Sequence, residues 1–416
     1  MKRFFTIFDC FERIFLMNNI YRSLSVITLA GAILLCSCST NLGPETLPST
    51  TPTTVETEPE PTETVETTFP EATEPSSKPV VTEKIVEKHG KLSIDGKNLV
   101  DSEGETVILK GISTYGIQDC GDFFTAEVVK TLAEDWGCDI LRISLTGDKD
   151  SGYLKDADKN FDTICKLCDM CTEQGIYVLI DWDVLYADEA DENKDAAVDF
   201  FKRISAIYSD SPNILYEVSN AQIPVTAAAE TDEEPEEVDD WGDNIKPFAE
   251  EVIEALRENS PDSIIIVDVS DNGIGIDAAV DSDLDYDNIA YGCKFYSGSQ
   301  GQELRDKIKD AADDDYCVFI TGWGLCNDRG LGGVYYTESG KWAEFFDEYE
   351  ISWCNYAIGS SVKDDANALK LDSERYTDEQ KYSGHWPDGL LSKSGAYAKE
   401  QLLKVPAEPL TEDTEE

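Results

Sequence analysis

Carboxylate side chains stand at or near the ends of three apolar runs in this sequence. They are Asp183, Glu217, Asp268 and Asp271. Two carboxylates held close together can serve as a general acid and as a base or nucleophile, provided that the fold positions them correctly. The run that contains Glu217 continues into Ser219, Asn220 and Ala221. The amide of Asn220 can bind a ligand, whereas the methyl group of Ala221 has no acid–base chemistry.

Eight apolar runs have the length and composition of buried β-strands. They are residues 108–112, 140–143, 177–180, 214–218, 264–267, 290–295, 317–320 and 351–354. Segments with apolar residues at helical spacing lie between most of them, and the segment after the fifth run is the weakest. Apolar strands that alternate with amphipathic helices predict a parallel sheet covered on both faces. Eight such units predict an α/β fold, a (β/α)8 TIM barrel, with functional residues at the carboxyl ends of the strands.

The first 38 residues have the features of a bacterial lipoprotein signal peptide. Arg22 precedes an apolar run, residues 24–35, that is too short to span a membrane as a helix. The run ends in Leu35-Cys36-Ser37-Cys38, which resembles a lipobox and predicts Cys38 as the lipidated residue. An ordinary secretory signal stays open as the alternative. The prediction is an extracytoplasmic protein, lipid-anchored to the bacterial cell membrane.

The remaining chain divides into three predicted parts. Residues 39–84 are rich in Thr, Pro and Glu and predict a disordered linker, because they bury too little apolar surface to fold. Residues 85–405 form the barrel, which opens with a small β-hairpin of strands 91–94 and 107–109, and residues 406–416 are an acidic tail. Within the barrel, the acidic segment Glu230 to Glu237 predicts a solvated loop, with a lid or partner contact left open.

Acidic residues outnumber basic ones by 85 to 34, which gives a formal net charge of −51. Such a charge repels nucleic acid and anionic lipid headgroups, so no nucleic-acid partner is predicted. A neutral polysaccharide is not repelled.

Cysteine and acidic motifs do not predict a metal or cofactor. Three of the 12 cysteines lie in the first 38 residues, and the other nine cannot all form pairs. Cys165, Cys168 and Cys171 lack the fourth ligand of an iron–sulfur site and share an apolar helical stripe, which predicts buried thiols. Asp156-x-Asp158-x-Asn160 starts like a calcium loop, but Phe161 stands where glycine is needed.

Segments distributed over residues 90–405 resemble glycoside hydrolase family 5, in particular its bacterial endo-β-1,4-glucanase (cellulase) branch. Examples are Asn213-Ile214-Leu215-Tyr216-Glu217 and Thr321-Gly322-Trp323-Gly324, and further matches in family order lie at residues 91–94, 109–113, 135–137, 175–182, 245–247, 295–298 and 351–353. The resemblance implies a barrel that acts on β-glucan. Family members retain anomeric configuration with two carboxylates, an acid/base and a nucleophile.

Five polar positions of the family's catalytic site are changed in this sequence. The acid/base Glu that follows the fourth-strand Asn is Ala221, and the nucleophile Glu before Trp-Gly is Gly322. Three family His positions are Tyr115, Asp183 and Lys294. Neither His89 nor His385 falls at these positions. The resemblance therefore predicts that no catalytic residue remains, and an ion pair between Asp183 and Lys294 is expected across the barrel mouth.

Part of the sugar-binding frame is retained. The predicted substrate-binding residues are Arg142, Trp182, Asn220, Tyr296, Trp323 and Tyr356, and Trp386 is a further aromatic candidate. Aromatic faces pack against sugar C–H groups, and polar side chains bind the hydroxyls. For Arg142 the alternative is a structural pair with a buried acid.

The sequence thus predicts a cell-surface lipoprotein whose cellulase-like barrel is inactive and binds β-glucan or a related polysaccharide. Two other interpretations stay open. One is an active O-glycosyl hydrolase with displaced carboxylates, and the other is a scaffold protein that binds no sugar.

Overall fold

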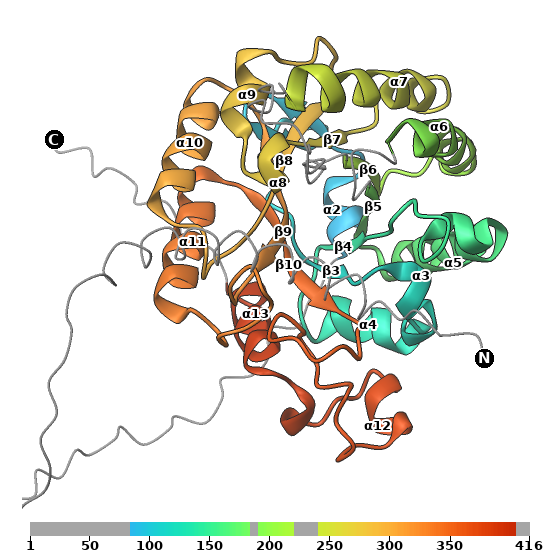
Figure 1. Ribbon diagram of the computed structural model, residues 1–416, viewed down its shortest axis with the longest axis vertical. Coiled ribbons are helices and arrows are strands. Elements are labelled where there is room, and N and C mark those ends of the chain that lie inside the picture. The colour runs from blue at the N-terminus through green and yellow to red at the C-terminus, as the bar shows by residue number, and fades with distance from the viewer. Residues whose placement is uncertain (1–83, 184–189, 220–239, 405–416) are drawn as a thin grey trace, which may run out of the picture. The chain divides into compact units, whose positions relative to one another are not determined.

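The computed structural model describes residues 84–183, 190–219 and 240–404 (Figure 1). The predicted signal peptide, acidic loop and acidic tail lie outside these ranges. So do Asn220, Ala221 and the whole predicted linker apart from Lys84. Within the ranges, no helix has both the length and the apolar character that crossing a membrane requires.

Eight parallel strands close into a barrel, as the sequence predicts, with the last strand paired to the first. They are β3 (Lys110–Thr114), β4 (Ile140–Ile143), β5 (Tyr177–Asp183), β6 (Ile214–Ser219), β7 (Ile265–Asp268), β8 (Ile289–Tyr296), β9 (Val318–Gly324) and β10 (Ser352–Ile358). Almost every side chain of these strands is buried, because their neighbours fill both the barrel interior and the space under the helices. The (β/α)8 prediction is confirmed.

Helices surround the barrel on its outer side (Figure 1). The longer ones are α4 (Ala126–Glu134), α5 (Ala157–Gln174), α6 (Ala190–Ile207), α7 (Lys246–Arg257), α10 (Gln302–Asp313), α11 (Tyr336–Tyr349) and α13 (Lys393–Leu402). Short α-helical turns are α3 (Ile117–Cys120), α8 (Ser270–Gly273), α9 (Ile276–Asp281) and α12 (Asp378–Tyr382). Short 3-10 helices are η1 (Gly121–Phe123), η2 (Tyr153–Asp156) and η5 (Asp388–Leu390), and η4 (Asp240–Ile245) is a short π-helix. The helical segment after the fifth barrel strand is short, as the sequence suggests, since the chain between β7 and β8 forms the two short helices α8 and α9.

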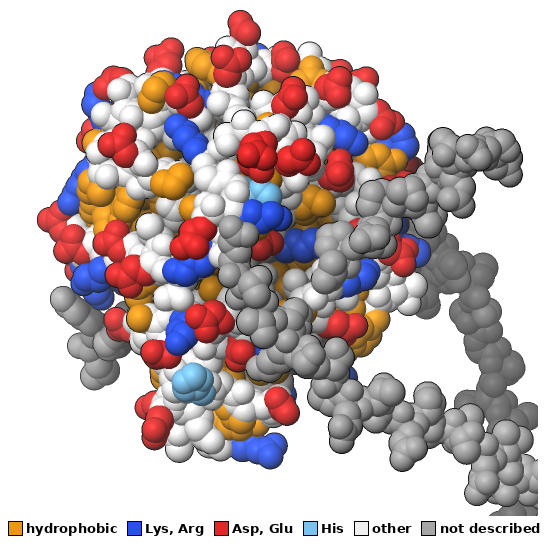
Figure 2. Space-filling model, turned by 180° about the vertical axis from the view of Figure 1, so that it is seen from behind, with side chains coloured by type: hydrophobic (Ala, Val, Ile, Leu, Met, Phe, Trp, Pro, Cys, Tyr) orange, Lys and Arg blue, Asp and Glu red, His pale blue; other side chains and the backbone are white. Residues whose placement is uncertain are grey.

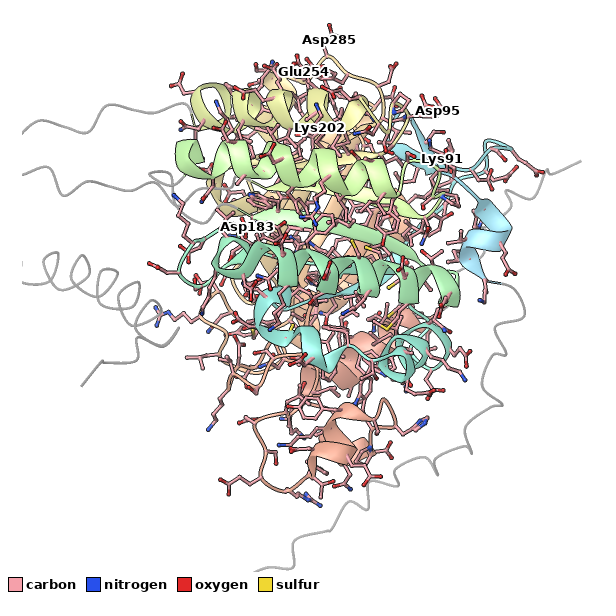
Figure 3. The ribbon with its side chains drawn as sticks, turned by 90° about the vertical axis from the view of Figure 1, so that its right-hand side faces the viewer. Lys91, Asp95, Asp183, Lys202, Glu254 and Asp285 are labelled. Atoms are coloured by element: carbon pink, nitrogen blue, oxygen red, sulfur yellow. The ribbon has the colours of Figure 1, made fainter. Side chains whose placement is uncertain are left out.

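A short helix and a hairpin lie at the amino ends of the strands. They are α2 (Ile85–His89), β1 (Ser93–Asp95) and β2 (Asn98–Val100), with β1 and β2 antiparallel. The prediction that residues 107–109 form the second strand of the hairpin is wrong. The chain turns at Asp95-Gly96, and residues 98–100 pair with residues 93–95. Val107 instead donates its backbone N–H to the Leu99 carbonyl at 2.8 Å. In Figure 3, Asp95 lies at one end of the barrel and Asp183 toward the other.

The nine cysteines of the described residues are all free thiols. Eight are buried, and Cys165 on α5 is half-buried. Cys168 and Cys171 pack in the core beside Ile164 and Leu167, which confirms the predicted apolar stripe. Burial raises the pKa of the Cys168 thiol well above its usual value, so this group stays neutral and unreactive.

Candidate functional site

Polar side chains converge at the carboxyl ends of the barrel strands, here called the mouth. Asp183 ends β5, Asp268 ends β7, Lys294 lies near the end of β8, and Tyr356 lies near the end of β10. Figure 3 places Asp183 at this end of the molecule. This is the edge at which (β/α)8 barrels place ligand-binding residues.

Lys294 joins two carboxylates at the mouth. Its Nζ lies 2.9 Å from Asp268 Oδ2 and 3.7 Å from Asp183 Oδ2. The predicted pair of Asp183 and Lys294 is therefore confirmed, but Asp268 is the nearer partner. Asp268 is fully buried and also accepts a hydrogen bond from Thr321 Oγ1. Burial lowers the pKa of Lys294, but the charges of Asp183 and Asp268 outweigh it and raise that pKa, so the amine remains an ammonium.

Three glycines lie close to Lys294 and Asp268. A Cβ on Gly292 would lie 2.0 Å from Asp268 Oδ1, and one on Gly273 would lie 2.5 Å from the Lys294 Cγ. Gly322 pairs with Lys294 across β8 and β9, and a Cβ there would lie 3.2 Å from the Lys294 Cβ. A side chain at position 322 would therefore begin in close contact with the Lys294 side chain.

Arg142 forms a second, deeper charge cluster. Its Nε and one terminal nitrogen donate to the two oxygens of Glu217, each at 2.6 Å, and the other terminal nitrogen donates to Ser113 Oγ at 3.1 Å. A further ion pair joins the guanidinium to Asp181 Oδ2 at 2.9 Å. All three charged groups are almost fully buried. Glu217 and Asp181 are thus the structural partners of Arg142 that the sequence left open, and the Arg142 side chain is only 3% exposed.

Burial and mutual charge set the protonation of this deeper cluster. Burial raises the pKa of Asp181 and of Glu217, and the Arg142 guanidinium opposes both shifts. The surrounding carboxylates raise the pKa of Arg142, although burial alone lowers it. Burial outweighs the guanidinium, so the pKa of each acid stays above its usual value, and both acids are held too deep to reach a ligand at the mouth.

Three half-buried tyrosines line another part of the mouth. The ring centroids of Tyr115 and Tyr356 are 5.3 Å apart, and those of Tyr296 and Tyr356 are 6.4 Å apart. Tyr115 Oη donates to Asp364 Oδ2 at 3.1 Å. Burial, helped by the charge of Asp364, raises the pKa of Tyr356 to about 12, so its phenol stays protonated. These tyrosines combine apolar faces with polar tips, and Asp364 is a site residue that the sequence analysis missed.

Two of the predicted sugar-binding tryptophans do not reach the mouth. Trp182 is fully buried against Tyr153 and Phe200, with ring centroids 5.2 Å away in both cases. Trp323 is also fully buried, and its Nε1 donates to Ser297 Oγ at 2.7 Å. Both rings pack in the hydrophobic core with the helices, and their contact with a ligand stays a prediction.

The third tryptophan candidate also has a packing role. Trp386 stacks on Phe123 and meets Trp136 edge-on, with ring centroids 6.1 and 5.7 Å away, and it is half-buried. Of the predicted binding residues, Tyr296 and Tyr356 are the two that lie in place at the mouth, and Asn220 lies outside the described residues. In the described ranges, no cluster of His, Cys, Asp or Glu has an arrangement that would hold a metal ion.

Comparison with known proteins assigns the barrel to a family. A family model described as Cellulase (glycosyl hydrolase family 5) matches residues 100–362. The chain belongs to glycosyl hydrolase family 5. Within this family it is 33% identical to an endoglucanase of Clostridium saccharobutylicum over 313 residues, 75% of this chain and 65% of the relative. It is 32% identical to endoglucanase N of Pectobacterium atrosepticum over 320 residues, 76% of this chain and 66% of the relative.

Solved structures of family 5 share the fold. The catalytic domain of Thermobifida fusca endoglucanase Cel5A matches with a TM-score of 0.67 and 28% identity, over 77% of this chain and 100% of that chain. The structure named Cellulase Cel5C_n matches with a TM-score of 0.68 and 31% identity, over 78% and 95%. The chain spans about two thirds or less of the length of the curated family 5 relatives named above.

Proposed function

We propose that this family 5 barrel binds a β-glucan chain at its mouth without hydrolysing it. The observation that carries the proposal is the ammonium of Lys294, held between Asp183 and Asp268 beside Gly322. Retaining hydrolysis needs two carboxylates roughly 5 Å apart, one as acid/base and one as nucleophile. By the family resemblance, those positions are Ala221 and Gly322, and neither side chain can do this work.

The charge of Lys294 also opposes the family reaction. The transition state of glycoside hydrolysis carries positive charge on the sugar ring, and an enzyme stabilises it with negative groups placed where that charge develops. Here Asp183 and Asp268 are paired with an ammonium instead. Because its pKa is raised, Lys294 cannot serve as a base near neutral pH. Asp183 and Asp268 thus lack both the freedom and the surroundings that catalysis requires.

Glucan binding is supported by the tyrosines and by the relatives. Tyr296 and Tyr356 present half-buried rings with protonated phenols, which suits the alternating C–H and hydroxyl faces of a glucose unit. The curated relatives named above are endoglucanases, and the Thermobifida fusca catalytic domain has also been solved in complex with cellotetraose. A neutral glucan also suits a chain with a net charge of −51.

A second candidate is an active endoglucanase, which the names of those relatives favour. Its acid pair would be Asp183 and Asp268, the two carboxylates that face each other across Lys294. This function requires Lys294 to leave both acids when substrate binds.

One experiment separates these functions. The full chain is incubated with carboxymethylcellulose for reducing-sugar release, and is run in native gels that contain barley β-glucan. We expect retardation by the glucan with no sugar release. Tyr356→Ala should abolish retardation, whereas Tyr316→Ala, a half-buried tyrosine just before β9 at the opposite end of the barrel, should not. Sugar release that disappears in Asp183→Asn would establish the active enzyme, and neither release nor retardation would leave a scaffold.

We further propose that the chain is tethered by lipid at Cys38 outside the bacterial cytoplasm. The apolar run that ends in Leu35-Cys36-Ser37-Cys38 supports this proposal. Expression in a bacterial host with labelled palmitate should label the protein, and Cys38→Ala should remove the label. A wild-type chain that is secreted without label would instead fit an ordinary signal peptide.

A further inference from the structure

The five-residue helix α2 lies at the amino end of the barrel, away from the mouth, and is held there by few contacts. None of its residues is fully buried. Ile85 and Val86 pack partly buried against the barrel core, and the Val86 N–H donates to the Gly175 carbonyl at 3.1 Å. An isolated helix of this length is unstable in water. The helix α2 therefore depends on its contacts with the barrel.

One of these contacts joins a histidine to a carboxylate. Nδ1 of His89, the last residue of α2, lies 2.8 Å from Asp101 Oδ2, and each side chain is only 10% exposed. The other Asp101 oxygen accepts the backbone N–H groups of Glu103 and Glu105 at 3.0 and 3.1 Å, which fixes the carboxylate in place. The hydrogen bond from His89 lowers the pKa of Asp101 more than burial raises it, so Asp101 is ionised near neutral pH.

The residue after His89 is tied to the barrel by a contact of another kind. Tyr177 of β5 donates its phenol to the Gly90 carbonyl at 2.6 Å. Burial raises the pKa of this phenol, so it stays a donor well above neutral pH. A histidine, by contrast, ordinarily changes its charge between pH 5 and 8. The contact of His89 with Asp101 is thus the one of this pair that changes in that range.

We propose that α2 is a pH-sensitive clasp on the amino end of the barrel, closed while His89 is protonated and released when the imidazole loses its proton. A protonated imidazole forms a charge-assisted hydrogen bond with Asp101, which is roughly twice as strong as a neutral one. Release of α2 frees residues 84–89 and adds roughly 20 Å of extended chain to the segment that precedes the barrel. The clasp would therefore set the length of the connection to the barrel according to pH.

Other charged or titratable groups surround this contact. They are Lys84, Glu87 and Lys88 on or before α2, Lys91 after it, Glu103 and Glu105 beside Asp101, Glu173 at the end of α5, Tyr177, and Asp139 just before β4. Burial raises the pKa of Asp139 to about 7, although the Lys110 N–H and the charges of Lys110 and Lys88 oppose the shift. Asp139 therefore ionises in the same range as a histidine. Its carboxylate attracts Lys88, so its ionisation holds α2 in place and opposes the effect of His89.

The test follows hydrogen exchange of the full chain by mass spectrometry at pH 5 and pH 8. Rates are corrected for the intrinsic pH dependence of amide exchange. Because acidic side chains are spread over the surface, as on the face in Figure 2, all buffers have the same ionic strength. The N–H groups of Val86, Lys88 and Gly90, which donate to backbone carbonyls, report on the clasp. We expect their protection to be about tenfold lower at pH 8 than at pH 5, since one hydrogen bond loses its charge.

Matched variants assign this response to His89. His89→Gln keeps a hydrogen-bonding side chain that does not titrate, and Asp101→Asn removes the anion. Neither variant should lose protection at pH 8 relative to pH 5. The control is His385→Gln, because His385 is the other histidine of the chain and is exposed between α12 and η5. It should respond like wild type, and Asp139→Asn should respond at least as strongly.

Several outcomes would overturn the clasp. They are equal protection of wild-type α2 at both pH values, a response that persists in His89→Gln, and a response that disappears in His385→Gln or Asp139→Asn. If His89 only packed against Asp101, His89→Gln would lower the protection of α2 but keep its pH dependence. A loss of protection at pH 8 that includes the amides of β5 would show unfolding of the barrel instead of release of α2.

Discussion

Hydrolysis is expected to appear when three positions change together, Ala221→Glu, Gly322→Glu and Lys294→His. The first two changes restore the acid/base and nucleophile of the family, and the third removes the ammonium that would neutralise the new nucleophile. Because a Cβ at position 322 lies 3.2 Å from the Lys294 Cβ, the double variant that keeps Lys294 should form an ion pair there and stay inactive. We expect the triple variant to exceed wild type in kcat/KM on carboxymethylcellulose by at least about 10³-fold.

Matched variants show which change matters. Lys294→His alone and Lys294→His with Gly322→Glu should release no reducing sugar, since each lacks the acid/base. All variants are first compared by circular dichroism, because replacing Lys294 removes an ion pair of the buried Asp268. A double variant as active as the triple would show that Lys294 does not block the nucleophile position. A folded but inactive triple variant would place the loss in further positions, with Asp183 and Tyr115 as the first to restore.

The barrel strands could be predicted because each is buried on both faces. A parallel strand between interior and helices is apolar along its length, so β4, β5 and β9 stand out as short apolar runs. The hairpin was harder to assign. Its second strand, β2, is only three residues long. From the sequence, the apolar segment at 107–109 could equally well be the strand that pairs with β1. Only the tight turn after Asp95 decides between them.

The mouth could be predicted in part. Asp183 and Lys294 stand at strand ends with opposite charges, which was enough to predict their pair. The partner of Arg142 could not be chosen, because several carboxylates lie at similar positions and burial decides among them. The burial of Trp323 could not be predicted because the direction of a side chain near a strand end depends on register. β9 pairs irregularly with both neighbours, with shifts beside Lys294 and Trp353, and such bulges leave no sequence signal.

Replacement of Arg142 by methionine should cause the largest loss of stability. The variant leaves Glu217 and Asp181 buried without their guanidinium, and breaking a buried pair of this kind costs about 3–5 kcal/mol. Burial already raises the pKa of both acids, and without Arg142 both should hold their protons to still higher pH in the folded state. Stability from such groups is complete below their unfolded pKa values and is lost as pH rises through the folded ones. Urea unfolding should therefore show a larger deficit at pH 8 than at pH 5.

Arg305→Met is the matched control, because Arg305 is also buried and paired with one carboxylate, Glu338. That partner is 24% exposed, so water can solvate it when the pair is broken, and Arg305 also stacks on Trp342. We expect a loss of no more than about 2 kcal/mol. The pKa of Glu338 is lowered, since Arg305 and Lys341 outweigh burial, so its contribution is lost only in acid and the deficit should stay constant from pH 5 to 8. Adding Glu217→Gln to Arg142→Met should recover part of the stability at pH 8, because it removes one of the two buried acids that are left without the guanidinium. Equal losses in Arg142→Met and Arg305→Met, or a deficit in Arg142→Met that does not change with pH, would mean that Arg142 does not lower the pKa values of these acids.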